Sequence, residues 1–224
     1  MIEAVFLPSI LILKNKYVLH SSIQRLSHIV SKIIDRIENK GYNHNVTMYS
    51  EPKLGILFGR QEIDATVKKL AAEIGKDYRD KCPLLIGVLK GSFMFMADLI
   101  RLLDFPLEVD FIRLSSYGKG QKSLGKVRVV QGLRTQVKGR NVLVVEDIVD
   151  TGLTTAFLLD YLQKKKPASL RLCSLTDKPS RRQVPVIIDY LGFTVPDKFL
   201  VGYGLDWNEK FRNLPDICVV EDKE

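Results

Sequence analysis

The sequence predicts an α/β domain built on a mainly parallel central sheet that is flanked by helices. Two observations lead to this prediction. Uninterrupted apolar runs, such as residues 84–89 (LLIGVL) and much of residues 141–149 (NVLVVEDIV), are typical of strands that are buried on both faces. These runs alternate with segments of helical periodicity, such as residues 61–78. Such alternation favours strands that are joined by helices into a parallel sheet.

Each element has its own justification along the chain. Residues 61–78 place Ile63, Val67 and Leu70 on one face, which predicts a helix. Residues 91–103 and 151–166 are the other expected helices, and the lysines that end the latter suit the negative end of a helix dipole. The polar, glycine-rich residues 118–126 are expected to form a mobile loop. The expected strands are residues 84–89, 107–117, 126–132, 141–149, 169–178, 186–192, 199–206 and 217–220.

Length and composition indicate one domain without a membrane span. The chain has 224 residues, of which 46% are hydrophobic, and this is enough for one sizeable core. No apolar run approaches the roughly 20 residues that a membrane helix needs. Residues 5–13 contain Pro8 and lack a preceding basic region, so we expect no signal peptide. Cys82, Cys173 and Cys218 form no C-x-x-C pair, which favours free thiols in a reducing cytoplasm.

The charge of the chain favours anionic partners. Its net charge is +8 and its pI is about 9.3. We expect no nucleic-acid partner, because the aromatic residues are not interleaved with basic ones, and no membrane partner. His20, His28 and His44 are the only histidines, and all precede residue 48. If the functional residues lie after residue 47, they include no histidine. This excludes Ser-His-Asp and Cys-His nucleophilic mechanisms and most histidine-based metal sites from that part of the chain.

Residues 1–47 are expected to form an N-terminal extension to a domain that covers residues 48–224. Apolar residues from Ile23 to Ile37 recur at helical spacing among basic residues, which predicts a basic amphipathic helix over about residues 22–39. The alternative is an appended segment with little order, because Met48 precedes a natural beginning of the domain.

Three acids and a Thr-Gly-Leu-Thr turn stand where the strand at residues 141–149 leads into the next helix. In an open α/β sheet, ligands bind beyond the carboxyl ends of the strands. The backbone N–H groups of Thr151 to Thr154 can hold a phosphate, while Glu146 and Asp147 can accept hydrogen bonds from vicinal hydroxyls. The segment is not a Walker A loop and predicts a binder of ribose 5-phosphate. Helix capping by Asp150 or Thr151 is the structural alternative.

Residues 144–155 (VVEDIVDTGLTT) resemble the phosphoribosyl-pyrophosphate (PRPP) motif of the type I phosphoribosyltransferases. Three further segments are similar to parts of the hypoxanthine(-guanine) phosphoribosyltransferase family. Residues 87–99 resemble its pyrophosphate loop, residues 110–118 the strand that enters its mobile active-site loop, and residues 196–220 its purine-binding end. The resemblance covers about residues 55–221. It implies the type I phosphoribosyltransferase fold, with a small hood formed by the C-terminal and N-terminal parts of the domain.

The resemblance also implies an activity. A member of this family would transfer the 5-phosphoribosyl group from PRPP to N9 of hypoxanthine or guanine, giving IMP or GMP and pyrophosphate, in purine salvage. The implied cofactor is Mg²⁺, the implied substrates are PRPP and a 6-oxopurine, and the implied assembly is a homodimer or homotetramer. Leu153 departs from the pattern, because some members carry a basic residue there, but the loop works through its backbone. Residues 1–47 have no counterpart.

The resemblance implies a role for each matching residue. Asp150 would be the general base or acid near purine N7, Lys178 would donate to the purine 6-oxo group, and Phe199 would stack on the base. Ser116 and Tyr117 would lie on a loop over about residues 115–126 that closes on the reacting centre. The ribose and 5-phosphate would be bound by Glu146, Asp147, Asp150, Thr151, Gly152, Leu153 and Thr154; the pyrophosphate by Leu89, Lys90, Gly91 and Arg212; the purine by Lys178, Phe199, Leu200 and Asp206; and the metal by Glu146, Asp147 and Asp206. The Leu89–Lys90 peptide bond would be cis.

Two other functions stay open. A non-catalytic PRPP-sensing regulator on the same fold would keep the ribose-phosphate site and lose the base pocket, whereas Lys178, Phe199 and Asp206 are all present. The second open function is a xanthine-preferring phosphoribosyltransferase, because in the family that this chain resembles the purine 2-position is recognised largely by backbone groups. The structural alternatives are a solvated Lys178, a core Phe199, and a surface ion pair for Asp206 and Arg212.

Overall fold

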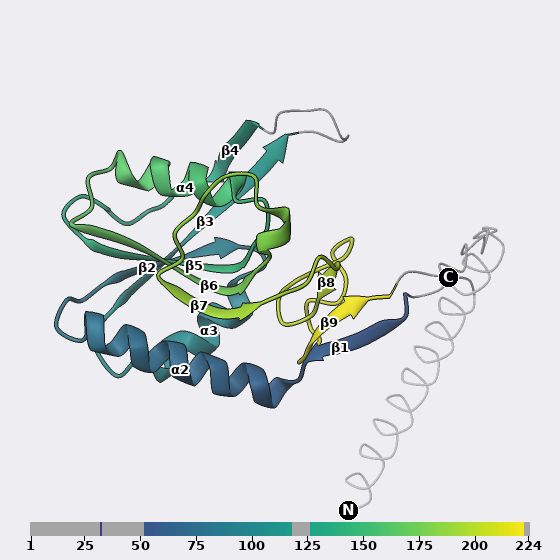
Figure 1. Ribbon diagram of the computed structural model, residues 1–224. Coiled ribbons are helices and arrows are strands. Elements are labelled where there is room, and N and C mark those ends of the chain that lie inside the picture. The colour runs from purple at the N-terminus through teal and green to yellow at the C-terminus, as the bar shows by residue number, and fades with distance from the viewer. Residues whose placement is uncertain (1–31, 33–51, 118–125, 222–224) are drawn as a thin grey trace, which may run out of the picture. The chain divides into compact units, whose positions relative to one another are not determined.

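A computed structural model describes residues 32, 52–117 and 126–221 (Figure 1). The helix expected over residues 22–39 therefore lies outside the described residues, except for Lys32. Most of the mobile loop expected over residues 115–126 lies outside them as well. The division of the chain into an extension and a domain after residue 47 stays a prediction.

A six-stranded sheet in the order β4-β3-β2-β5-β6-β7 forms the centre of the fold (Figure 1). Its strands are β2 (Leu84–Leu89), β3 (Glu108–Tyr117), β4 (Lys126–Gln131), β5 (Asn141–Val149), β6 (Ser169–Asp177) and β7 (Tyr190–Thr194). All neighbouring strands are parallel except β4, which runs antiparallel along the edge of β3. Residues Val142 to Val145 of β5 have no exposed surface, as their apolar run predicted. The predicted α/β class is confirmed.

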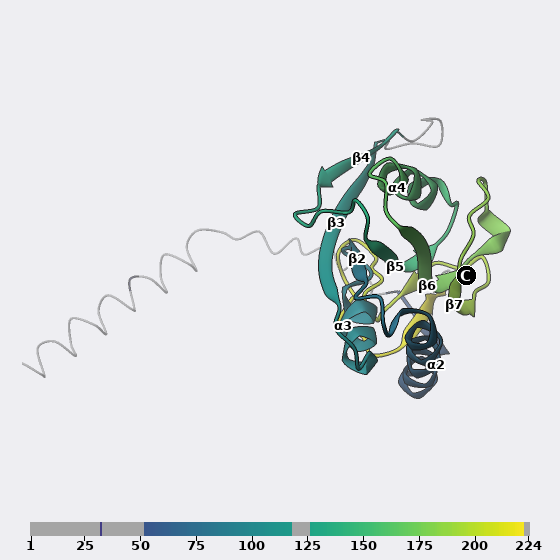
Figure 2. The same cartoon turned by 90° about the vertical axis from the view of Figure 1, so that its left-hand side faces the viewer.

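Helices cover both faces of this sheet (Figures 1 and 2). α2 (Arg60–Tyr78) and α3 (Phe93–Leu102) lie on one face, and α4 (Leu153–Gln163) lies on the other. The apolar stripe of α2 packs with Phe95 and Leu99 of α3 in one core cluster, while Leu158 and Leu162 of α4 belong to a second cluster. No helix within residues 52–117 and 126–221 is long and apolar enough to cross a membrane.

A second, antiparallel sheet forms the expected hood beside the central sheet (Figure 1). It has the order β1-β9-β8, with β1 (Leu54–Phe58), β8 (Leu200–Val201) and β9 (Ile217–Val220). Leu54 pairs with Val220, and Ile56 pairs with Cys218. The hood thus joins the beginning of the described domain to its end. β1 was not among the expected strands, because its run of five residues carries little pattern.

Three expected elements differ most from their bounds in the structure, while several others differ by one or two residues. The helix expected over residues 151–166 covers only Leu153–Gln163, because Gly152 has a φ of 84° and belongs to the preceding turn. The strand expected over residues 186–192 begins at Tyr190, because Asp189 turns its carboxylate to the backbone N–H of Leu172 at 2.8 Å. The strand expected over residues 199–206 is reduced to two residues, because Gly202, Tyr203 and Gly204 have positive φ angles.

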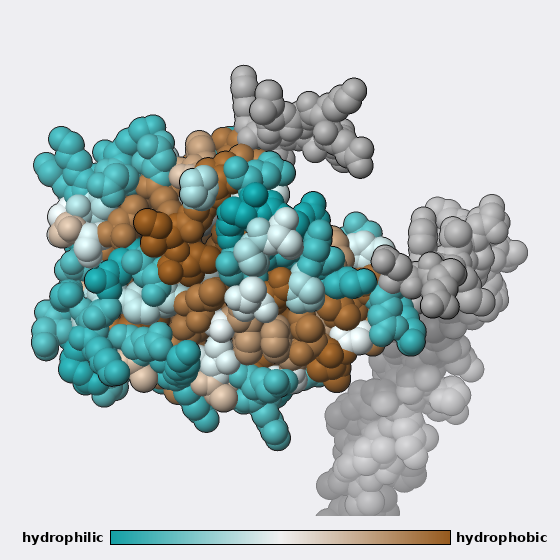
Figure 3. All heavy atoms as spheres, in the orientation of Figure 1, coloured by the Kyte–Doolittle hydropathy of each residue, from teal (hydrophilic) through white to brown (hydrophobic). Residues whose placement is uncertain are grey.

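Some large apolar side chains are exposed on the surface, and the three cysteines are free. The exposed large apolar side chains include Ile56, Val130 and Ile187. On the face drawn in Figure 3, hydrophilic side chains cover the periphery and apolar ones gather toward the middle. Cys82, Cys173 and Cys218 are all free, as their spacing predicted.

Candidate active site

A cavity of about 310 Å³ opens where β2, β5 and β6 end, next to the hood. The carboxyl ends of parallel strands meet at one edge of a sheet, so residues that are far apart in the sequence come together there. The cavity is lined by Lys90, Gly91, Asp147, Ile148, Asp150, Lys178, Arg181, Phe199, Leu200, Leu205, Asp206 and Arg212. A larger cavity of about 490 Å³ lies between α2 and the end of α3 and contains none of the predicted site residues. Convergent polar groups make the smaller cavity the candidate site.

Two adjacent acids lie near the end of β5, and one of them, Asp147, lines the cavity. Glu146 is buried, and its Oε2 has no hydrogen-bond partner in the described part of the chain. Asp147 is partly buried and lies against Gly91. A Cβ atom added to Gly91 would stand only 1.8 Å from Oδ2 of Asp147. Only glycine at position 91 therefore lets the loop after β2 approach this carboxylate.

The two carboxyl groups are held in an environment that opposes their negative charge. Burial raises the pKa of Glu146 well above its usual value, and the neighbouring Asp147 raises it further. Burial also raises the pKa of Asp147 to about 6, although the charge of Arg212 acts in the opposite direction. A ligand that brings hydrogen-bond donors or a cation would relieve this cost, so the acid pair is suited to hydroxyl groups or to a metal ion.

Asp150, Thr151 and Gly152 form a turn between β5 and α4, which we call the phosphate turn. Gly152 takes the left-handed conformation that this turn requires, with a φ of 84°. The N–H groups of the turn donate to no backbone group within the described residues. Oδ1 of Asp150 is buried and lies 3.5 Å from Nε of Arg181. Free N–H groups at a helix N-terminus form a site that favours an anion.

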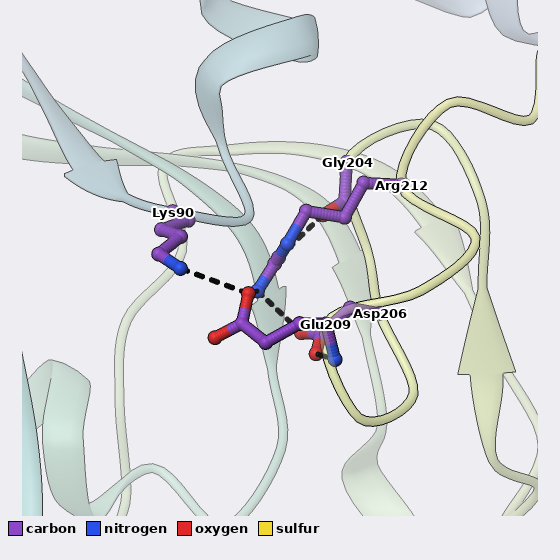
Figure 4. A network of polar contacts seen from close by, with 5 residues as sticks. All are labelled: Lys90, Gly204, Asp206, Glu209 and Arg212. Atoms are coloured by element: carbon purple, nitrogen blue, oxygen red, sulfur yellow. Dashed lines mark hydrogen bonds and ion pairs between the residues drawn. The ribbon is translucent and has the colours of Figure 1, made fainter. Parts of the chain in front are cut away.

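The loop after β2 and the hood supply the cations of the site (Figure 4). The Leu89–Lys90 peptide bond is cis, as expected. The Lys90 ammonium group donates to Glu209 Oε2 at 2.8 Å. Arg212 reaches Asp206 Oδ1 at 2.7 Å and Glu209 Oε2 at 3.2 Å. Its Nη1 donates to the Gly204 carbonyl at 2.7 Å, which fixes the guanidinium group against the hood.

The other end of the cavity has an apolar surface and one buried cation. Lys178 is buried, and its Nζ donates to the Lys198 carbonyl at 2.8 Å, so it is not a solvated lysine. Phe199 is 54% exposed and lines the cavity, so it is not a core aromatic. Leu200 and Leu205 are buried beside it. This end of the cavity therefore combines an exposed aromatic side chain with a buried hydrogen-bond donor.

Nine predicted site residues line the cavity: Lys90, Gly91, Asp147, Asp150, Lys178, Phe199, Leu200, Asp206 and Arg212. Leu89, Glu146 and Thr151 to Thr154 are not among the lining residues, although each adjoins one or belongs to the phosphate turn or the start of α4. Ser116 and Tyr117 end β3, and the neighbouring residues 118–125 lie outside the described ranges.

Sequence reasoning missed Arg181, Ile148 and Leu205, which line the cavity, and Glu209, which lies beside it. Arg181 follows Lys178 by three residues and pairs with Asp150 and, at 3.8 Å, with Asp197. It could have been found as a basic residue just after a strand end. Glu209 gave no such signal, because its role depends on the Lys90 and Arg212 side chains that reach it from both sides.

Three carboxylates at or beside the cavity are the groups that could contribute ligands to a metal ion. No group of three or more His, Cys, Asp or Glu side chains that could hold a metal occurs within the described ranges. The available donors are carboxylate oxygens, which suit Mg²⁺. Mg²⁺ is usually held by one or two carboxylates together with substrate phosphates and water. The acids Glu146, Asp147 and Asp206 fit this mode.

Comparison with known proteins gives consistent results. Residues 57–208 match the model of the phosphoribosyl transferase domain family. A relative from Bacillus subtilis (strain 168), called hypoxanthine-guanine phosphoribosyltransferase, is 47% identical over 166 residues, which cover 74% of this chain and 92% of the relative. A relative of the same name from Aquifex aeolicus (strain VF5) is 49% identical over 171 residues, which cover 76% of this chain and 96% of the relative.

A solved structure agrees with these matches. The crystal structure of a hypoxanthine-guanine phosphoribosyltransferase from Bacillus anthracis superimposes with a TM-score of 0.72 and 45% sequence identity. The match covers 76% of this chain and 100% of that chain.

Proposed function

The chain belongs to the hypoxanthine-guanine phosphoribosyltransferases, and from this premise we propose that it joins the 5-phosphoribosyl group of PRPP to N9 of hypoxanthine or guanine. One observation carries the proposal. A single cavity of about 310 Å³ is lined by Asp147 and Asp150 from the end of β5 and the turn after it, by Lys90 and Arg212, and by Lys178 and Phe199. The products would be IMP or GMP and pyrophosphate, as in purine salvage.

PRPP would lie along the carboxyl ends of the strands. Its 5-phosphate would accept hydrogen bonds from the free N–H groups of the phosphate turn and face the positive end of α4. Glu146 and Asp147 would accept hydrogen bonds from the ribose hydroxyls, which their unfavourable burial supports. The pyrophosphate would lie between the Lys90 loop and Arg212, whose planar guanidinium group suits phosphate oxygens.

Mg²⁺ would be bound together with PRPP. Asp147, with Glu146 beside it, and Asp206 would supply carboxylate oxygens directly or through water. The unpartnered, buried Oε2 of Glu146 supports this assignment. When bound, the ion neutralises charge on the pyrophosphate that leaves.

The purine would occupy the pocket beside the hood. Phe199 would stack on the ring, and the Leu200 backbone would face its edge. The Lys178 ammonium group would donate to the 6-oxo group, because it is buried but directed at an exchangeable acceptor, the Lys198 carbonyl. A 6-amino group cannot accept this hydrogen bond, so adenine would be rejected.

The reaction would replace one bond to C1 of the ribose by another. As the bond from C1 to the pyrophosphate oxygen breaks, the bond from C1 to purine N9 forms, and the purine loses a proton. Asp150 lines the cavity between the phosphate turn and the base pocket, and it would act at purine N7 as the general base, or as the acid in the reverse direction. Arg212 and the loop that carries Lys90 would stabilise the charge of the departing pyrophosphate.

A pyrophosphate-release assay tests this proposal. The enzyme is given PRPP and Mg²⁺ with hypoxanthine, guanine, xanthine or adenine in turn. We expect turnover with hypoxanthine or guanine and none with adenine. Turnover with xanthine alone would favour the xanthine-preferring enzyme, and no turnover with any base would favour the non-catalytic PRPP-sensing regulator.

The role of Asp150 has its own test. Asp150→Asn keeps the size of the side chain and removes its capacity to take a proton. We expect kcat to fall by roughly 10² or more, the contribution typical of a positioned acid or base, while PRPP still binds in calorimetry. A kcat within about threefold of the unchanged enzyme would contradict the assigned role. The cytoplasmic location and the homodimer or homotetramer stay predictions.

A further inference from the structure

Arg182 lies behind the phosphate turn, on the segment that follows β6 and the short 3-10 helix η1 (Pro179–Arg181). Its side chain is 18% exposed. Nη2 donates to the Asp177 carboxylate at the end of β6 and also, at 3.5 Å, to the carbonyl of Val149 at the end of β5. One guanidinium group therefore connects the ends of the two strands from which the site is built.

The same segment holds the carbonyl groups of the phosphate turn. The Val149 carbonyl accepts a hydrogen bond from the backbone N–H of Lys178 at 3.0 Å. The Thr151 carbonyl accepts from the N–H groups of Gln183 at 2.9 Å and Val184 at 3.2 Å. The Val149 carbonyl just before the turn and the Thr151 carbonyl within it thus point toward the segment that carries Arg182.

This arrangement determines where the N–H groups of the turn point. In a trans peptide the C=O and the following N–H point in opposite directions. With the carbonyls of Val149 and Thr151 held on the side of Arg182, the N–H groups of Asp150 and Gly152 face the other side. Neither N–H donates to a backbone group within residues 52–117 or 126–221. They are available to an anion.

Arg182 also packs directly against the glycine of the turn. A Cβ atom on Gly152 would stand 2.5 Å from the Val184 carbonyl oxygen and 3.1 Å from Nη1 of Arg182. Nη1 is itself buried and has no hydrogen-bond partner among the described residues. An unpaired buried donor is unfavourable in the free protein. The guanidinium group of Arg182 lies directly against the turn.

We propose that Arg182 is a positioning residue for binding of the 5-phosphate. It holds the Val149 carbonyl directly, and it fixes the following segment, whose Gln183 and Val184 N–H groups hold the Thr151 carbonyl, so that both carbonyls point away from the ligand. The inference rests on the proposed function, because it takes the 5-phosphate of PRPP as the ligand of the turn. Arg182 does not line the cavity and need not touch the substrate. Its effect is on the direction of the N–H groups that do.

Arg182→Gln tests the proposal, with Arg140→Gln as the matched control. Arg140 stands just before the start of β5 and makes the same two kinds of bond, to the Glu108 carboxylate at 2.9 Å and to the Cys82 carbonyl at 3.3 Å. It lies at the opposite end of the strand from the phosphate turn. A general loss of packing would affect both variants alike, whereas a loss of turn geometry affects Arg182→Gln alone.

The first measurement is binding of ribose 5-phosphate by calorimetry, which does not depend on turnover. We expect Arg182→Gln to weaken binding about tenfold or more and Arg140→Gln to leave it within about twofold. In kinetics, KM for PRPP should rise by a similar factor, while KM for the purine and kcat stay within about threefold. Unchanged ribose 5-phosphate binding, or equal losses in both variants, would overturn the proposal.

Two further variants keep the test decisive if Arg182→Gln does not fold. Arg182→Lys retains the charge but cannot reach Asp177 and the Val149 carbonyl with one planar group, so it should not restore binding. Asp177→Asn weakens the anchor of Arg182 and should reduce ribose 5-phosphate binding without adding fully to Arg182→Lys. Full binding by both variants would refute the positioning role. Failure of the proposed function is distinct, since it appears in the unsubstituted enzyme as absence of turnover.

Discussion

Gly91→Ala places one methyl group in the closest contact of the site. The added Cβ would stand 1.8 Å from Oδ2 and 2.3 Å from Cγ of Asp147, and neither distance is compatible with van der Waals contact. Gly91 does not need a left-handed backbone, so the substitution is decided by this contact alone. Either the Asp147 carboxylate or the loop after β2 must move away.

The size of the effect follows from the distance. A carbon–oxygen contact is normally on the order of 3.2 Å, so relief requires a shift of more than about 1 Å. A misplacement of about 1 Å at a reacting centre can cost roughly 10²-fold in rate. We therefore expect kcat/KM for PRPP to fall by about 10²-fold or more, which corresponds to about 2.7 kcal/mol of transition-state stabilisation.

Steady-state kinetics at saturating hypoxanthine measure this loss, and thermal unfolding shows that the fold persists. Gly132→Ala is the control, because the nearest atom to its added Cβ, Cγ1 of Val129, is 4.0 Å away. The control should be within about twofold of the unchanged enzyme. If folded Gly91→Ala retained kcat/KM within about threefold, the contact between Gly91 and Asp147 would not position the site, and the reasoning would be refuted.

Two further predictions concern the acids of the site. Asp147 has a pKa raised from 3.8 to about 6, so the folded chain binds its proton more tightly, and ionisation lowers the stability of the fold as pH rises from about 4 to 6. Asp147→Asn should therefore raise the free energy of unfolding at pH 8 by at most about 3 kcal/mol and leave it unchanged near pH 4. Urea unfolding at the two pH values measures this difference, and equal effects at both would contradict the prediction. Glu209 binds both of the cationic side chains that we assign to pyrophosphate, since Lys90 and Arg212 donate to its carboxylate. Glu209 would therefore compete with pyrophosphate for these two side chains. Glu209→Gln should lower the inhibition constant of pyrophosphate several-fold at low salt and less at high salt, with Glu73→Gln on α2 as the control; a raised constant would mean that Glu209 positions the two cations instead.

The sequence predicted best those central strands that are buried over most of their length. Residues 84–89 and 141–149 have the bounds that were expected, because a strand buried on both faces reads as a largely apolar run. The strand end at Glu146 and Asp147 was likewise recognisable, because acids rarely follow such a run without a ligand or a cap.

Predictions failed where distant contacts decide the local structure. Tyr203 appeared to continue a strand, but its hydroxyl donates to Asp98 of α3 at 2.6 Å and the chain bends at the glycines on either side. Gly204 must be glycine because a Cβ there would meet the Gly91 carbonyl at 2.1 Å. No periodicity or propensity encodes such contacts between segments that are more than a hundred residues apart.

The hood has a consequence for the order in which the protein is made. Because β1 pairs with β9, Leu54 can form its strand pair only after Val220 has been synthesised and has left the ribosome. The strands that carry the phosphate turn are synthesised earlier, and β5 can pair with β2 and β6 before β9 exists. Domains tend to fold as their chain emerges, while pairing over a long separation is slow. The nascent chain should therefore acquire the capacity to bind a phosphate before it acquires a pocket for the base.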